Sequence, residues 1–164
     1  MDDVIARVIE KMIKYFGTDV RRINHALKVY GFANCIARNE KLSASDAFCV
    51  DIAAILHDIG IVEAEMKYNS TSGCYQEMEG PAVARKIVEN EMLDDKMLDR
   101  ICYIIGNHHS YQNIDGIDFQ IIVEADFLVN IHEDEMSDQA IHSIRDKYFK
   151  TKTGISLIDG IYMQ

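Results

Sequence analysis

Residues 43–60 read SASDAFCVDIAAILHDIG, and their pattern predicts the central helix of the protein. Ser43 and Asp46 have the spacing of a capping box, which marks the start of a helix. The run that follows is apolar on almost every side, so it predicts a helix at the centre of the protein. His57 and Asp58 close this buried run, and a glycine then ends it. Burying two polar side chains at the inner end of a helix costs free energy, so their position needs a structural or functional explanation.

The rest of the chain also shows helical periodicity, with apolar residues three and four positions apart and no convincing alternating strand. We therefore expect an all-α fold, a compact bundle of about seven helices, in one domain over residues 1–164. Residues 62–79 are irregular and predict a long loop, of the kind that is often functional. The helices expected besides the central one run from residue 4 to Gly17, from Thr18 or Asp19 to Asn39, from Gly80-Pro81 onward, and over about 94–109, 118–133 and 137–149.

Composition limits the partners. The chain has 164 residues and a formal net charge of −10, which argues against binding a nucleic-acid duplex because that needs a basic surface. A small anionic substrate remains compatible, since a bound cation reverses the field locally. No apolar stretch approaches the ~20 residues of a membrane span. The four cysteines form no CxxC pair, so we expect reduced thiols and a cytoplasmic protein.

Five polar residues fall on or at the end of predicted buried stripes: His25, His57, Asp58, His108 and Asp126. Each alone has a structural explanation, such as a hydrogen-bonded core histidine, a helix-terminal aspartate or a buried ion pair. Together, two histidines and two aspartates on three inward-facing helices supply the nitrogen and oxygen ligands of one divalent cation. The cation would offset the cost of burying the carboxylates.

These residues carry a family resemblance. His25, then His57-Asp58 within LHDIG, then Asp126 within EADFLVN resemble the H…HD…D signature of the HD-domain metal-dependent phosphohydrolase superfamily, over roughly residues 20–135. The resemblance implies a helical fold and a metal held by His25, His57, Asp58 and Asp126. It further implies that Asp58 is the ligand able to bridge to a second ion.

The resemblance is incomplete at the second ion. His108 and His109 match the later histidines of members that hold two metals, but Gln76 stands where an earlier histidine is expected. Glu79 or Glu77 is a possible substitute carboxylate, although an acid before the helix predicted from Gly80 also suits the helix dipole. Many relatives carry a lysine after HDIG, whereas this chain has an isoleucine there.

The resulting hypothesis is a metal-dependent phosphohydrolase that cleaves a nucleotide or another small phosphorylated molecule through a metal-activated water. The ion is one of Mn, Fe, Co, Ni, Zn or Mg, with a second ion possible. The catalytic candidates are Asp58, His108, His109 and Glu79, the histidines acting on charge or protons, or holding the second ion. The surface residues considered for phosphate or base contacts are Arg21, Arg22, Lys28, Lys67 and Tyr68, whereas His132 and His142 are expected to be plain surface residues.

Three other readings remain. A catalytically weak HD module could bind a nucleotide as a sensor or interaction domain, and Gln76 favours this alternative. A di-iron oxygenase would need a full set of second-metal ligands, which Gln76 argues against. A purely structural bundle would have to explain two buried aspartates without a cation. The sequence leaves the substrate, the native metal and the oligomeric state open.

Overall fold

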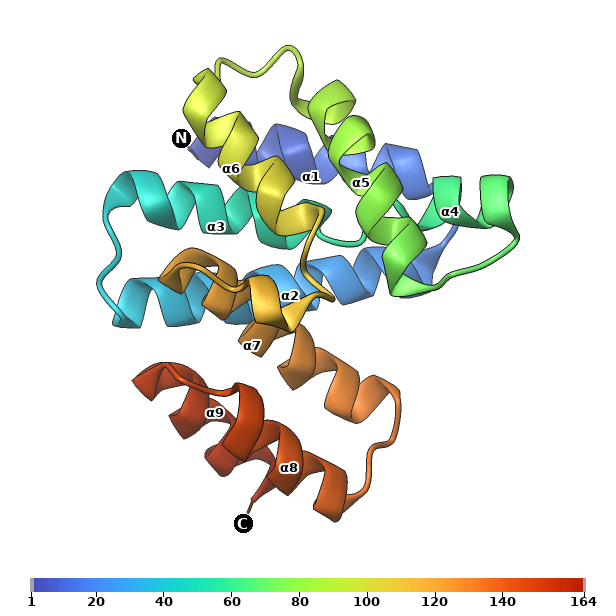
Figure 1. The fold of residues 1–164 in the computed structure, drawn as a ribbon. Helices are drawn as coiled ribbons and strands as arrows, with labels where there is room; N and C mark the ends of the chain where they lie inside the picture. Colours follow the sequence, from blue (N-terminus) through green and yellow to red (C-terminus); the bar gives the residue numbers. More distant parts are fainter. Residues whose placement is uncertain (1, 164) are drawn as a thin grey trace.

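A computed structural model describes residues 2–163 and is all-helical over that span, as predicted (Figure 1). No helix within this span is both long and apolar enough to cross a membrane. The elements are α1 (Asp2–Phe16), α2 (Val20–Asn39), α3 (Ala44–Leu56), α4 (Ile61–Tyr68), α5 (Gly73–Val88), α6 (Asp95–Ile105), the 3-10 helix η1 (Tyr111–Asn113), α7 (Ile117–Glu133), α8 (Asp138–Tyr148) and α9 (Lys152–Tyr162).

Capping residues begin the second and third helices where the sequence predicted. Ser43 accepts a hydrogen bond from the backbone N–H of Asp46 at 3.1 Å, and its hydroxyl donates to the Asp46 carboxylate at 2.7 Å. Asp19 likewise accepts from the backbone N–H of Arg22 at the start of α2. Such caps satisfy backbone donors that a helix start leaves unpaired.

The prediction of a loop over residues 62–79 and of a helix beginning at Gly80-Pro81 was wrong. The structure has α4 in that region, and α5 begins at Gly73 with Pro81 inside it. Gly80 serves close packing instead: a Cβ there would lie 2.6 Å from Ile105 Cγ2. A Cβ on Gly60 would lie 2.6 Å from the backbone nitrogen of Gly80. The two glycines let the turn after α3 pack directly on α5. Because this contact joins residues far apart in the chain, the local sequence pattern does not reveal it.

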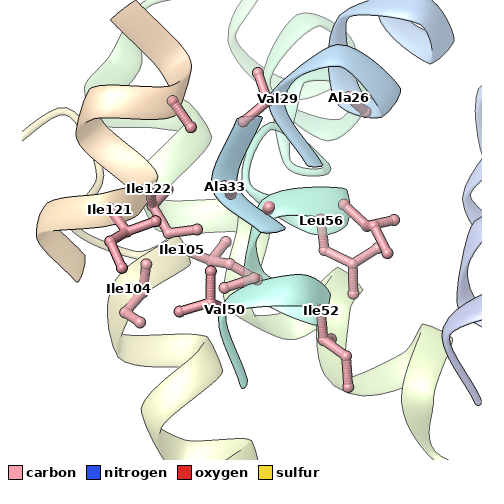
Figure 2. Close-up of a cluster of buried hydrophobic side chains, with 14 of the residues drawn as sticks. Ala26, Val29, Ala33, Val50, Ile52, Leu56, Ile104, Ile105, Ile121 and Ile122 are labelled. Carbon is pink, nitrogen blue, oxygen red and sulfur yellow. The ribbon is translucent and has the colours of Figure 1, made fainter. Parts of the chain in front are cut away.

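The apolar core centres on α3, whose residues 47–56 are all buried. Helix α2 packs against both α3 and α7, and α6 packs on the other side of α3. Figure 2 shows side chains of these four helices meeting, among them Val29, Val50, Ile105 and Ile122. Because α2, α3, α6 and α7 all pack into this core, the residues that border it are held in fixed positions.

Helices α8 and α9 lie together against α7 at the C-terminal end of the chain (Figure 1). A fully buried acid, Glu124 of α7, joins them. Its carboxylate accepts from the backbone N–H groups of Lys150 and Thr151 at 2.7 and 2.9 Å. Glu124 is therefore a buried carboxylate with a structural explanation, unlike the aspartates described next.

Candidate metal centre

Four side chains predicted as ligands meet where the end of α3 faces the N-terminal part of α2 and the middle of α7. His25 comes from α2, Asp126 from α7, and His57 and Asp58 from the turn that follows α3. His25 Nε2 lies 3.2 Å from Asp126 Oδ1 and 3.4 Å from Asp58 Oδ2. His57 Nε2 lies 3.4 Å from the same Asp58 oxygen. The two histidines and Asp126 are buried, and the Asp58 side chain is 24% exposed.

The tautomers of both histidines are fixed by their other ring nitrogen. His57 Nδ1 donates to the Ala54 carbonyl at 2.8 Å, and His25 Nδ1 donates to Glu133 Oε2 at 2.8 Å. In the neutral imidazole each Nε2 therefore carries a lone pair. The two Nε2 atoms face each other at 3.1 Å. Two lone pairs at this distance repel, so the arrangement requires a positive charge between them, and a metal ligated by Nε2 atoms fits this requirement.

The electrostatics of the cluster point the same way. Burial opposes protonation of His25, but its contact with the Asp126 carboxylate more than offsets this and raises its pKa. Burial also opposes protonation of His57, yet the neighbouring Asp58 carboxylate raises its pKa well above the ordinary value. Partial burial of Asp58 opposes its ionisation, but the charge of His57 holds its pKa well below the usual range. The carboxylates are thus ionised and draw a positive charge into the cluster, a role that a divalent cation fills.

A second group of possible ligands shares Asp58. His108 and His109 lie in the turn after α6. His108 Nδ1 donates to the Ile105 carbonyl at 2.8 Å, and its Nε2 faces Asp58 Oδ1 at 3.1 Å. His109 Nε2 lies 4.0 Å from the same oxygen. One Asp58 oxygen thus faces His25 and His57 while the other faces His108 and His109, so Asp58 belongs to both groups of possible ligands.

Two buried polar atoms beside this second group lack a hydrogen-bond partner within the described part of the chain: His109 Nε2 and Gln76 Oε1. The Gln76 amide is oriented by its nitrogen, which donates to the Thr71 carbonyl at 2.8 Å. Burial, reinforced by His108, lowers the pKa of His109 to about 4, so its ring is neutral at pH 7. Unpaired buried polar atoms are costly. Both residues line the hollow that Asp58 lines, where an ion or a water can satisfy them.

The structure does not bring Glu79 to this centre. Its carboxylate contacts Lys67 Nζ at 2.5 Å and the Tyr68 hydroxyl at 2.9 Å, which joins α5 to α4. Glu77 lies nearer but accepts from the backbone N–H of His109 at 2.9 Å and from the Ser110 hydroxyl at 3.1 Å. Glu77 thus holds the turn that carries the histidines, and Gln76 rather than either acid presents a free oxygen.

The surface candidates divide into two sets. Arg21 and Arg22 line the hollow of about 470 Å³ above the cluster, and Lys28 pairs with Glu133 at its edge. Lys67 and Tyr68 instead belong to the contact with Glu79. The two remaining histidines, at positions 132 and 142, are exposed, as predicted.

Sequence reasoning missed the supporting residues on α7. Asn130 donates to Asp126 Oδ1 at 2.9 Å, and Glu133 holds His25. Both follow Asp126 at intervals of four and seven residues, so they continue its face of the helix. This spacing is a signal that could have identified them, because each carries a polar group on a stripe that otherwise faces the core.

Comparison with known proteins agrees with this geometry. The HD domain family matches residues 22–148. No curated protein matches the chain significantly. Among solved structures, the fold is similar to that of a predicted HD superfamily hydrolase from an uncultured Thermotogales bacterium, with a TM-score of 0.67 and 22% sequence identity, covering 99% of this chain and 85% of the other.

Proposed function

Because this chain belongs to the HD-domain family, we propose that it is a metal-dependent phosphohydrolase acting on a nucleotide or another small phosphorylated molecule. One observation carries the proposal: His25 and His57 turn their Nε2 lone pairs toward each other and toward two ionised aspartates. Two neutral rings cannot satisfy these atoms by hydrogen bonding to each other; either a proton on one ring or a divalent cation is needed, and the cation is the choice that engages both rings and both carboxylates at once.

The ligands proposed for this cation are His25, His57, Asp58 and Asp126. A divalent ion in such a site lowers the pKa of a water and polarises a phosphoryl oxygen, which suits hydrolysis of a phosphoester. The chain supplies rigidity: carbonyl and carboxylate acceptors fix both rings, and Asn130 fixes the Asp126 carboxylate. In the overall reaction a water oxygen bonds to phosphorus, the ester bond breaks, and the leaving oxygen gains a proton.

We assign a second ion position to Asp58, His108, His109 and Gln76. The unpartnered His109 Nε2 and Gln76 Oε1 support this assignment, since each is a buried polar atom with no hydrogen-bond partner within residues 2–163. His108 and His109 are then ligands near the reacting phosphate, and the acid Glu79 takes no part. The candidate ions are Mn, Fe, Co, Ni, Zn and Mg, because nitrogen and oxygen ligands accept all of them.

A second function remains in competition, a catalytically weak module that binds a nucleotide as a sensor. The glutamine at position 76 favours it, because an amide oxygen is a weaker ligand than an imidazole. Turnover separates the two functions: a sensor binds a nucleotide tightly and does not hydrolyse it.

The test is elemental analysis of the purified protein, followed by a hydrolysis screen with p-nitrophenyl phosphate and nucleotides in Mn²⁺, Co²⁺, Ni²⁺ or Mg²⁺. We expect His57→Ala and Asp58→Ala to lose both the bound metal and turnover. His142→Ala is the matched control, because His142 is exposed on α8. Turnover that survives both site substitutions would remove the proposed centre, and binding without turnover in the wild type would leave the sensor.

A further inference from the structure

Two hollows on the surface share a wall. The hollow above the candidate metal centre has a volume of about 470 Å³, and a second hollow of about 690 Å³ lies between α2 and the C-terminal helices. Arg21 and Glu133 line both. Arg21 precedes His25 by four residues on α2, so it stands one turn away on the same face of the helix. A ligand that extends from the metal centre into the second hollow must pass Arg21.

Arg21 is also the available cation at this junction. Arg22 is engaged with Glu65 at 2.6 Å and with Asp19 at 3.3 Å. Lys28 is engaged with Glu133. Arg21 forms no ion pair with any described residue, although acids surround it in a chain of net charge −10. Its five N–H donors in a planar fork match the oxygens of a phosphate.

The charges around the first hollow set the direction in which an anionic substrate can extend. Asp19, Asp134 and Glu133 line its walls in addition to the metal-binding aspartates. A second anionic group pointing toward Asp19 or Asp134 meets like charge, which is unfavourable at short range. Next to Arg21 the same group meets an unpaired guanidinium. The favourable path therefore leads past Arg21 into the second hollow.

The second hollow suits an apolar body. Ile131 and Ile141 are buried in its floor, and Met136 and Tyr162 are partly buried beside them. Its rim carries Asn24, Lys28, His132, Glu133 and Glu135, so the uncharged body of a ligand fits here better than a further anionic group does. An apolar surface with a polar edge is the usual character of a site for a small organic molecule.

We propose that Arg21 is a specificity residue that binds a second anionic group of the substrate. The substrate class is then an organic diphosphate or polyphosphate, with one phosphate at the metal centre, another on Arg21 and an apolar or aromatic body in the second hollow. This inference rests on the proposed function for the position of the scissile phosphate. It adds the direction in which the substrate extends, its second anionic group and the apolar character of the rest of the substrate.

The test measures equilibrium binding of adenosine α,β-methylene diphosphate to the Mn²⁺-loaded protein, using Arg21→Ala, Arg21→Lys and the control Lys14→Ala. Lys14 is an exposed cation that lines a different hollow, away from α7. A charge-assisted contact to phosphate predicts that Arg21→Ala raises the dissociation constant about tenfold or more, with Arg21→Lys intermediate. Lys14→Ala should bind as the wild type does.

Steady-state kinetics supply the second readout. Arg21→Ala should raise KM for a nucleoside diphosphate by a larger factor than KM for p-nitrophenyl phosphate, with a smaller effect on kcat. Wild-type binding by Arg21→Ala, an equal loss in Lys14→Ala, or no binding by the wild-type protein would overturn the inference. Hydrolysis of p-nitrophenyl phosphate by the wild type reports separately on the proposed function, so the two can fail independently.

Discussion

Glu133 offers the sharpest test of the metal centre, because it touches a proposed ligand without being one. Its Oε2 accepts from His25 Nδ1 at 2.8 Å, and its other oxygen pairs with Lys28. The carboxylate keeps the His25 proton on Nδ1 and so leaves the Nε2 lone pair free for the proposed ion. Glu133→Gln removes the charge but retains an acceptor of the same shape, whereas Glu133→Ala removes both.

The size of the effect follows from the burial of this contact. The side chains of His25 and Glu133 are 9% and 14% exposed, so solvent screens their interaction little. A hydrogen bond to a charged group contributes about 1.5–3 kcal/mol in such settings. Outer partners of metal-bound histidines alter metal affinity roughly 10–100-fold, or about 1.4–2.7 kcal/mol, which agrees. We therefore expect about a tenfold loss for Glu133→Gln and nearer a hundredfold for Glu133→Ala.

The assay is calorimetric titration of the metal-free protein with Mn²⁺, alongside circular dichroism to verify that each variant folds. Glu135→Gln is the matched control, since it makes the same charge change two residues away, where Glu135 is exposed. The reasoning is refuted if both Glu133 variants bind Mn²⁺ with the wild-type dissociation constant. It is equally refuted if Glu135→Gln weakens binding as much as Glu133→Gln does.

Three further predictions concern stability and reactivity. Removing the metal by chelation should lower Tm by roughly 5–11 °C. An ion at a hundred times its dissociation constant stabilises the folded protein by about 2.7 kcal/mol, and the Tm of a chain of this size shifts by about 2–4 °C per kcal/mol. An unchanged melting curve would argue against bound metal. Gly60→Ala should destabilise the fold by about 1–3 kcal/mol in urea titration, because its Cβ would meet the backbone of Gly80 at 2.6 Å, and a wild-type midpoint would exclude that clash. Burial raises the pKa of Cys49 to about 12. At pH 8 a thiol reagent should therefore modify the exposed Cys35 and Cys74 quickly, while Cys49 stays unmodified in the folded protein. Rapid modification of Cys49 would show that α3 opens readily.

The proposed ligands closest to the core could be identified in the sequence because they are polar residues in an otherwise apolar pattern. His25 and Asp126 are polar residues on stripes that are otherwise apolar, and burial of such groups demands a partner. The sequence cannot state the partner, but it limits the choice to groups that satisfy an imidazole and a carboxylate together. The same reasoning placed His57 and Asp58, since the central helix is apolar up to the residue before them.

The second half of the site was harder to predict because its positions depend on contacts between distant segments. Gly80 and Pro81 have the local pattern of a helix start, and only the packing of Gly60 on Gly80 reveals that they lie inside α5. With the start of α5 misplaced, Glu79 was expected beside the histidines, although α5 turns it toward Lys67. A shift in a helix boundary thus changes which side chain faces the site.

Gln76 shows how the two kinds of inference combine. The sequence marks it only as a departure from the family pattern, whereas the structure gives it a buried oxygen fixed by the Thr71 carbonyl and left without a donor among the described residues. An amide oxygen is a harder and weaker ligand than the imidazole it replaces, and oxygen ligands favour Mn²⁺ or Mg²⁺ over softer ions. The two ion positions proposed here should therefore differ in affinity, with the one shared by His25, His57, Asp58 and Asp126 filled first. Occupancy of the weaker position would then follow the free metal concentration, and activity that requires both ions would follow it too.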